Sequence, residues 1–173
     1  MNTKISDLMP DVSPLAQAAV DEMEMKGIPH AVTSTLRTVD EQAALYAQGR
    51  ETLDRVNALR KVAGMYEILA SENTYTVTNC DGVNTKSNHQ SGRAIDIVPL
   101  NDRGSPIWPP HSDPRWQPIV DVMKGRGFKW GGDFAGTFKD FPHYEMVLDA
   151  EGSVSLASGL SLRDRPRLMG ATA

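Results

Sequence analysis

Residues 87–98 read SNHQSGRAIDIV, and they place a histidine and a glycine directly before an apolar run that contains one carboxylate. The run from 94 to 100 predicts a strand, in which alternate side chains face opposite sides. Both faces are apolar except at Asp96. A charged carboxylate in such surroundings is costly unless it meets a cation. Asp96 therefore needs a partner, and a turn at Gly92 can fold the chain back so that His89 reaches it.

The partner of Asp96 is left open by this stretch alone. Arg93 or Arg37 could neutralise it in a buried salt bridge, which is the commoner arrangement for an isolated strand aspartate. A second stretch, residues 140–145 (DFPHYE), changes that balance because it again holds an acid and a histidine close together. Two histidines and one carboxylate suit a catalytic zinc ion, whose fourth position is left for water.

The sequence thus predicts a zinc site with three protein ligands: His89, Asp96 and His143. Asp140 is then spare, three residues before a ligand, and is suitably placed to take a proton from the water. His30 and His111 lack an acidic or glycine context of this kind, so we interpret them as structural or surface residues. The single cysteine, Cys80, excludes an internal disulfide and is interpreted as a small buried thiol.

Composition narrows the class of protein further. A chain of 173 residues, 40% of them hydrophobic, suits one compact domain. The formal net charge is −4 with no run of like charges, which argues against a nucleic-acid partner. No apolar segment has the length of a signal peptide or of a membrane span, so we expect no signal peptide and no stable membrane insertion. Nothing in the composition suggests more than a monomer.

Short predicted strands are scattered among predicted helices without a regular βαβ repeat, which favours an α+β fold. Residues 1–150 are expected to form one domain, with a helical insert at about 51–72, and 151–173 a loosely held extension. The expected helices cover residues 13–27, 38–48, 51–70 and 113–125. The expected strands cover residues 30–35, 75–78, 94–100 and 143–148.

These residues resemble a known family. SNHQSGRAIDI is similar to a Ser-x-His-x-x-Gly-x-Ala-x-Asp-Ile signature, and DFPHYEM to an Asp-x-Pro-His-aromatic-Glu/Gln signature. Both belong to the VanY-like (M15) peptidoglycan peptidases, which include D-Ala-D-Ala carboxypeptidases and phage L-alanyl-D-glutamate endopeptidases. The resemblance runs from about residue 34 to 146, because STLRTVDEQAALYAQGR, TVTN and GFKWGGDF follow in the family's order.

The resemblance implies a role for each matching residue. It implies that His89, Asp96 and His143 bind one zinc ion. It further implies that Asp140 is the general base, that Arg37 steadies the scissile carbonyl or its oxyanion, and that Ser87 and Gln42 support or contact the substrate. The implied fold is the small α+β domain shared with the Hedgehog signalling domain, in which an antiparallel sheet with flanking helices carries the zinc.

The last motif also bears on which family member this chain resembles. Carboxypeptidases and dipeptidases of the family generally carry Glu-x-x-His there, whereas the phage endopeptidases carry Asp-x-x-His, as Asp140 does here. The LYAQGR and WGGDF segments point the same way. The resemblance thus implies an endolysin that cuts the L-Ala-D-Glu bond of the peptidoglycan stem peptide and lyses the host wall. With no signal peptide expected, it would stay in the host cytoplasm until a holin releases it to the wall.

Three other functions remain open at this stage. A D-Ala-D-Ala carboxypeptidase or dipeptidase would share the metal site. A non-haem iron oxygenase also uses two histidines and a carboxylate, but its usual first pair is His-x-Asp, whereas His89 and Asp96 are seven residues apart. A Hedgehog-like binding module could keep zinc without catalysis, yet it would need neither Asp140 nor Arg37.

Overall fold

The computed structural model describes residues 1–147. The predicted extension at 151–173 and the end of the last predicted strand lie outside the described residues. The helices in this range are α1 (Ser13–Met25), α2 (Val39–Ala47), α3 (Leu53–Val62) and α4 (Trp116–Gly125), with short 3-10 turns η1 (Ile5–Asp7), η2 (Glu72–Thr74), η3 (Asn88–Ser91) and η4 (Gly131–Asp133). The strands are β1 (His30–Ser34), β2 (Ala94–Pro99), β3 (Lys129–Trp130) and β4 (His143–Glu145).

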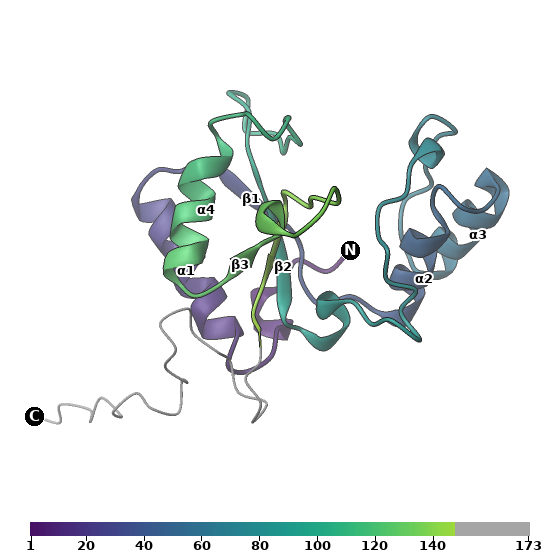
Figure 1. Ribbon diagram of the computed structural model, residues 1–173, viewed down its shortest axis with the longest axis horizontal. Helices are drawn as coiled ribbons and strands as arrows, with labels where there is room; N and C mark the ends of the chain where they lie inside the picture. The colour runs from purple at the N-terminus through teal and green to yellow at the C-terminus, as the bar shows by residue number, and fades with distance from the viewer. Residues whose placement is uncertain (148–173) are drawn as a thin grey trace, which may run out of the picture.

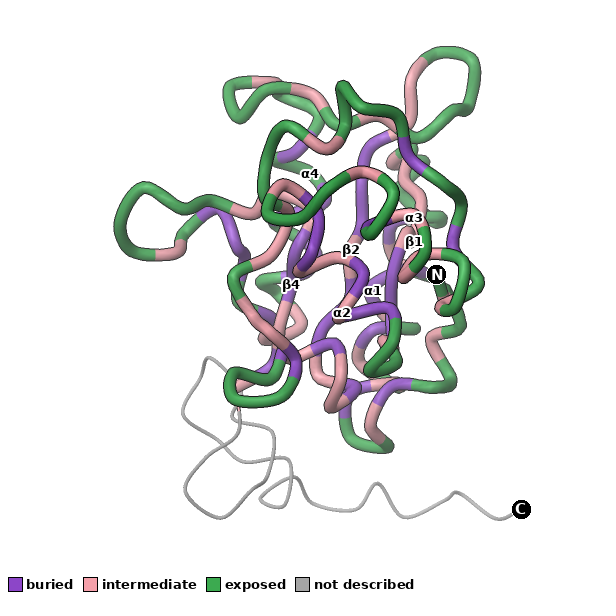
Figure 2. Tube along the Cα trace, turned by 90° about the vertical axis from the view of Figure 1, so that its right-hand side faces the viewer, coloured by how far each residue is buried: buried purple, intermediate pink, exposed green. Residues whose placement is uncertain are grey.

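The four strands form one antiparallel sheet in the order β1-β2-β4-β3, which confirms the predicted α+β fold. Helices α1 and α4 cover one side of the sheet (Figure 1). Their apolar faces pack against the inward side chains of β2, including Ile95 and Ile97, to form the main core. Figure 2 shows β2 largely buried in the middle of the molecule, with exposed loops around it.

Helices α2 and α3 form a small separate lobe beyond the other side of the sheet (Figure 1). The lobe has its own apolar cluster, which includes Ala47, Val56 and Ile68. The predicted capping box at the start of α2 is present: the Thr38 hydroxyl accepts from the backbone N–H of Glu41, and the Glu41 carboxylate accepts from that of Thr38. The capping box fixes the direction in which the chain enters the lobe.

The predicted helix at 51–70 is too long. Helix α3 ends at Val62, because Gly64 adopts a left-handed φ of 67° and turns the chain. The following irregular segment is held by the Asn57 side chain, which bonds to both the backbone N–H and the carbonyl of Ile68.

The predicted strand at 75–78 is also wrong. Residues 75–78 pair with no strand, although their side chains favour one. Within residues 1–147 the only donor to their backbone carbonyls is Arg50, which bonds to the Thr78 carbonyl at 2.9 Å.

Smaller differences concern element ends. Helix α1 has Val12 rather than Ser13 at its N-cap, and α4 begins at Trp116 rather than at Pro114, because Asp113 caps a preceding turn by accepting from the Arg115 N–H. Strand β3 was not predicted. None of the helices in residues 1–147 is long and apolar enough to span a membrane.

Gly92 makes the turn between η3 and β2 that the sequence predicts. Its φ is 67°, and a Cβ atom there would lie 2.9 Å from the backbone nitrogen of Met9. That nitrogen donates to the Gly92 carbonyl at 2.9 Å, so the N-terminal segment packs directly on the turn. Only glycine combines the left-handed conformation with this close approach.

We expect Gly92→Ala to destabilise the fold by about 3–4 kcal/mol, since the left-handed backbone and the contact with Met9 both oppose a side chain. Gly104→Ala is the matched control: its φ is 75° with open space around it, so only the backbone penalty of about 1–2 kcal/mol applies. Chemical denaturation of both variants measures the difference. Equal losses would contradict the role given to the Met9 contact.

Candidate metal centre

Three side-chain atoms converge beside the two inner strands of the sheet, from η3, β2 and β4. The Nε2 atom of His89 lies 3.0 Å from Oδ1 of Asp96 and 3.1 Å from Nδ1 of His143, and the last two atoms are 3.3 Å apart. The three residues are the only group in residues 1–147 whose ligand atoms gather in the way that a metal ion needs. The structure therefore brings together the three predicted ligands.

The register of the sheet and the Gly92 turn create this convergence. Asp96 of β2 lies directly opposite His143 of β4 in the antiparallel ladder. His89 sits in η3, which starts with a capping box between Ser87 and Gln90 and ends at Gly92. The turn returns the chain to β2 and places His89 beside the carboxylate seven residues later.

Both imidazole rings are oriented by acceptors on their outer nitrogens. The Nδ1 atom of His89 lies 2.7 Å from the carbonyl of Thr35, and Nε2 of His143 lies 3.0 Å from a carboxylate oxygen of Glu145. These oxygens only accept, so the outer nitrogens are the donors and the inner nitrogens of the neutral rings carry lone pairs. Asn88 steadies the same Glu145 oxygen at 2.6 Å. Such outer contacts orient metal-binding histidines.

Three lone-pair atoms within about 3 Å of one another need a positive charge between them. A metal ion supplies it, and the nitrogen and oxygen donors fit zinc. Although burial lowers the pKa of His143, its hydrogen bonds to Asp96 and Glu145 raise it to about 10. For Asp96 the effects are reversed. Burial raises the pKa of this carboxyl group, but the two histidines hold it well below its usual range.

Arg37 approaches the second oxygen of Asp96. Its Nη2 atom lies 3.7 Å from Oδ2, so the aspartate faces both the histidines and an arginine. Burial lowers the pKa of Arg37, and the nearby carboxylates oppose that shift. Of the two arginines proposed as partners, Arg93 instead donates to the Ser91 hydroxyl. The salt-bridge and metal interpretations of Asp96 are therefore compatible.

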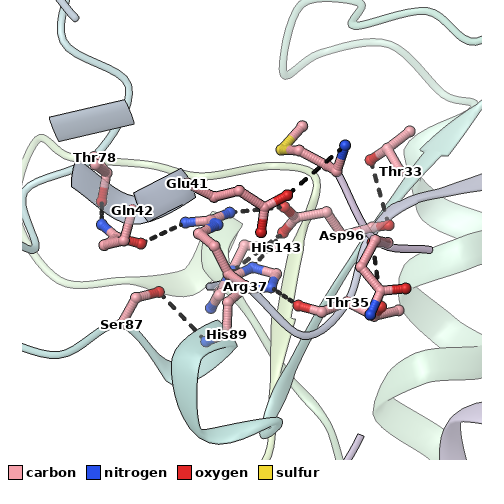
Figure 3. Close-up of polar contacts among 12 residues, drawn as sticks. Thr33, Thr35, Arg37, Glu41, Gln42, Thr78, Ser87, His89, Asp96 and His143 are labelled. Atoms are coloured by element: carbon pink, nitrogen blue, oxygen red, sulfur yellow. Dashed lines mark hydrogen bonds and ion pairs between the residues drawn. The ribbon is translucent and has the colours of Figure 1, made fainter. Parts of the chain in front are cut away.

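Gln42 is fully buried and holds Arg37 in place. Its side-chain oxygen accepts from Nη1 of Arg37 at 2.9 Å, and its amide nitrogen donates to the Thr78 hydroxyl (Figure 3). The same nitrogen also donates to the Cys80 carbonyl at 2.7 Å. Both ends of this amide are engaged within the protein. The predicted substrate-contacting side chain thus lies behind Arg37, whereas Ser87 lines the cleft and accepts from the His89 backbone N–H.

Asp140 lines the same cleft as the three converging residues. Its loop is held by a backbone bond from its N–H to the Gly131 carbonyl, and a Cβ atom at Gly131 would clash with the Asp140 carbonyl oxygen. Burial raises the pKa of Asp140, and the charge of Asp96 raises it further. A carboxylate with a raised pKa beside a metal site is suited to proton transfer.

The cleft above this group has a volume of about 610 Å³. One wall includes the chain at 75–80, and the lining also includes Trp108 and Phe138 from other loops. His30 and His111 line neither wall: His30 contacts the Ile28 carbonyl, and His111 stacks on an aromatic ring.

Neither Glu145 nor Asn88 was assigned a role from the sequence. The position of Glu145 could have been predicted, because residues two apart in a strand face the same side and Glu145 is two residues after His143. Asn88 has no such signal, since it precedes a ligand in a turn whose shape the sequence does not specify.

We expect His89→Ala and His143→Ala to lose stoichiometric zinc, because each removes a converging lone pair. Glu145→Ala should weaken zinc binding by about 10–100-fold, since it removes only the support of a ligand. His30→Ala is the histidine control and should bind like the unaltered protein. Titration calorimetry with zinc measures all four, and unchanged affinity in His89→Ala would contradict the assignment.

Comparisons with known proteins point to one family of peptidases. A family model described as D-alanyl-D-alanine carboxypeptidase matches residues 6–113, and a second model with that description matches residues 81–146. The peptidoglycan L-alanyl-D-glutamate endopeptidase CwlK of Bacillus subtilis (strain 168) is 33% identical over 148 residues, which cover 82% of this chain and 75% of that protein. The crystal structure of the L-Ala D-Glu endopeptidase ChiX of Serratia marcescens is similar in fold, with a TM-score of 0.50, 17% identity and 83% of each chain covered.

Proposed function

The chain belongs to the VanY family of D-alanyl-D-alanine carboxypeptidases, a family of peptidoglycan metallopeptidases, and from that membership we propose that it is a zinc-dependent L-alanyl-D-glutamate endopeptidase. The observation that carries the peptidase proposal is the spare acid: Asp140 lines the cleft above three converging ligand atoms and is not one of them. The choice of bond is supported by the Asp-x-x-His spacing and by the similarity to CwlK.

Each charged residue of the site has a proposed part in the hydrolysis. A zinc ion bound by His89, Asp96 and His143 would lower the pKa of a water molecule and polarise the scissile carbonyl. Asp140 accepts a proton from the attacking water and passes it to the leaving amine, a task for which its raised pKa suits it.

Arg37 supplies a fixed positive charge where the carbonyl oxygen becomes negative. It is buried and held by Gln42, so little reorganisation is needed as that charge develops. A non-catalytic Hedgehog-like module would have no use for Arg37 and Asp140 in the cleft, which favours an enzyme.

The proposed biological setting is that of a phage endolysin, a monomer that stays in the host cytoplasm until a holin lets it reach the wall. The resemblance of the Asp-x-x-His, LYAQGR and WGGDF segments to phage enzymes supports this setting. A D-Ala-D-Ala carboxypeptidase is the second candidate, because the matching family models carry that description.

We expect digestion of purified peptidoglycan by the zinc-loaded protein to create new N-terminal D-glutamate, detected by mass spectrometry of the released fragments. Chelator-treated protein should give no such product, and added zinc should restore it. Loss of terminal D-alanine instead would support the carboxypeptidase, and new reducing sugar ends would overturn both candidates.

We expect Asp140→Asn to keep zinc while kcat/KM on the stem peptide falls by at least about 100-fold, because the amide cannot accept the proton. Asp133→Asn is the matched control, since Asp133 is exposed in the same loop and pairs with Lys124 outside the cleft. Steady-state kinetics and zinc content are measured together. Near-normal turnover in Asp140→Asn would refute the assigned general base.

A further inference from the structure

The wall segment, defined here as residues 76–79, resembles a strand without a partner. It consists of Thr76, Val77, Thr78 and Asn79. All four residues line the cleft. Within residues 1–147, none of their backbone N–H groups has a hydrogen-bond acceptor, and of their carbonyls only that of Thr78 has a donor. Backbone groups that no protein group engages are left to water or to a bound molecule. The wall segment therefore offers a row of main-chain donors and acceptors to the cleft.

The wall segment is fastened from behind by the α2 lobe. Arg50 donates to the Thr78 carbonyl at 2.9 Å, and Gln42 donates to the Thr78 hydroxyl at 3.3 Å and to the carbonyl of Cys80, just after the segment. Gly49 packs so closely behind the segment that a Cβ there would lie 2.7 Å from the Thr76 nitrogen. These contacts hold the segment away from the sheet, so no strand of this chain completes it.

One backbone group of the wall segment is engaged, and those of its neighbour are free. The Thr78 carbonyl accepts from Arg50, which follows α2 in the lobe. The N–H and C=O of Val77, a residue that lines the cleft, are engaged by no group within residues 1–147. In Figure 1 this part of the trace runs along the side of the α2 lobe that faces the sheet.

We propose that the wall segment is a docking strand for the stem peptide, which pairs with it main chain to main chain through Val77; this rests on the proposed function. An extended peptide that adds to an unpaired strand edge is a known mode of recognition. Main-chain pairing reads amide groups rather than side chains. It therefore suits a stem peptide that mixes L and D residues, whose side chains no regular pattern of pockets would fit.

The first test measures protection of the wall segment. Zinc-loaded Asp140→Asn protein is saturated with muramyl pentapeptide, containing either lysine or diaminopimelate at the third position, and amide hydrogen exchange is followed. We expect exchange at residues 76–79 to slow by about tenfold or more, while the exposed loop at 101–105 is unchanged. No slowing at 76–79 with either peptide would overturn the proposal. Because the peptide contains both candidate bonds, this result does not depend on which bond is cut.

The second test removes one donor. Replacing Val77 by its α-hydroxy acid turns its amide into an ester and deletes the N–H with little change of shape. We expect KM for the pentapeptide to rise about tenfold, with kcat within about twofold and zinc content unchanged. The same amide-to-ester substitution at Tyr66, which is 92% exposed and outside the cleft, is the control. Unchanged KM at Val77 would overturn the docking strand, whereas a wild-type protein that leaves L-Ala-D-Glu intact would instead refute the proposed function.

Discussion

The meeting of three lone-pair atoms at Asp96 is the constraint on which the rest of the site depends. The outer nitrogens of His89 and His143 are committed to the Thr35 carbonyl and to Glu145, so the inner nitrogens face the carboxylate without a proton of their own. Such an arrangement is stable only around a cation. Asp96 is partly buried between two buried histidines, and the charge that burial would penalise is balanced by what the group binds.

Two parts of the chain divide the work of the site. The sheet and the η3 turn supply the converging ligands, and the α2 lobe supplies part of what surrounds them. Gln42 connects the two, because it bonds to Arg37 on one side and to the carbonyl of Cys80 on the other. A shift of the lobe would therefore move both the arginine beside Asp96 and the wall of the cleft.

The ligand group could be predicted from sequence because its determinants are local. A glycine turn, a strand aspartate and a second acid-histidine pair are visible as short patterns, and the antiparallel register then brings them together. The position of Gln42 could not be predicted, since its burial depends on a loop 36 to 38 residues away. The residues at 75–78 do favour a strand, but their propensity does not show whether a partner strand exists. Propensity describes a chain segment, whereas pairing depends on the whole fold.

The most direct test of the metal centre is a crystal structure of the protein grown with zinc, with diffraction data collected on both sides of the zinc absorption edge. We predict one anomalous peak between Nε2 of His89, Nδ1 of His143 and Oδ1 of Asp96, with the Asp140 carboxylate outside the coordination sphere. A protein that shows no peak there, or a peak ligated by Asp140 in place of Asp96, would contradict the account.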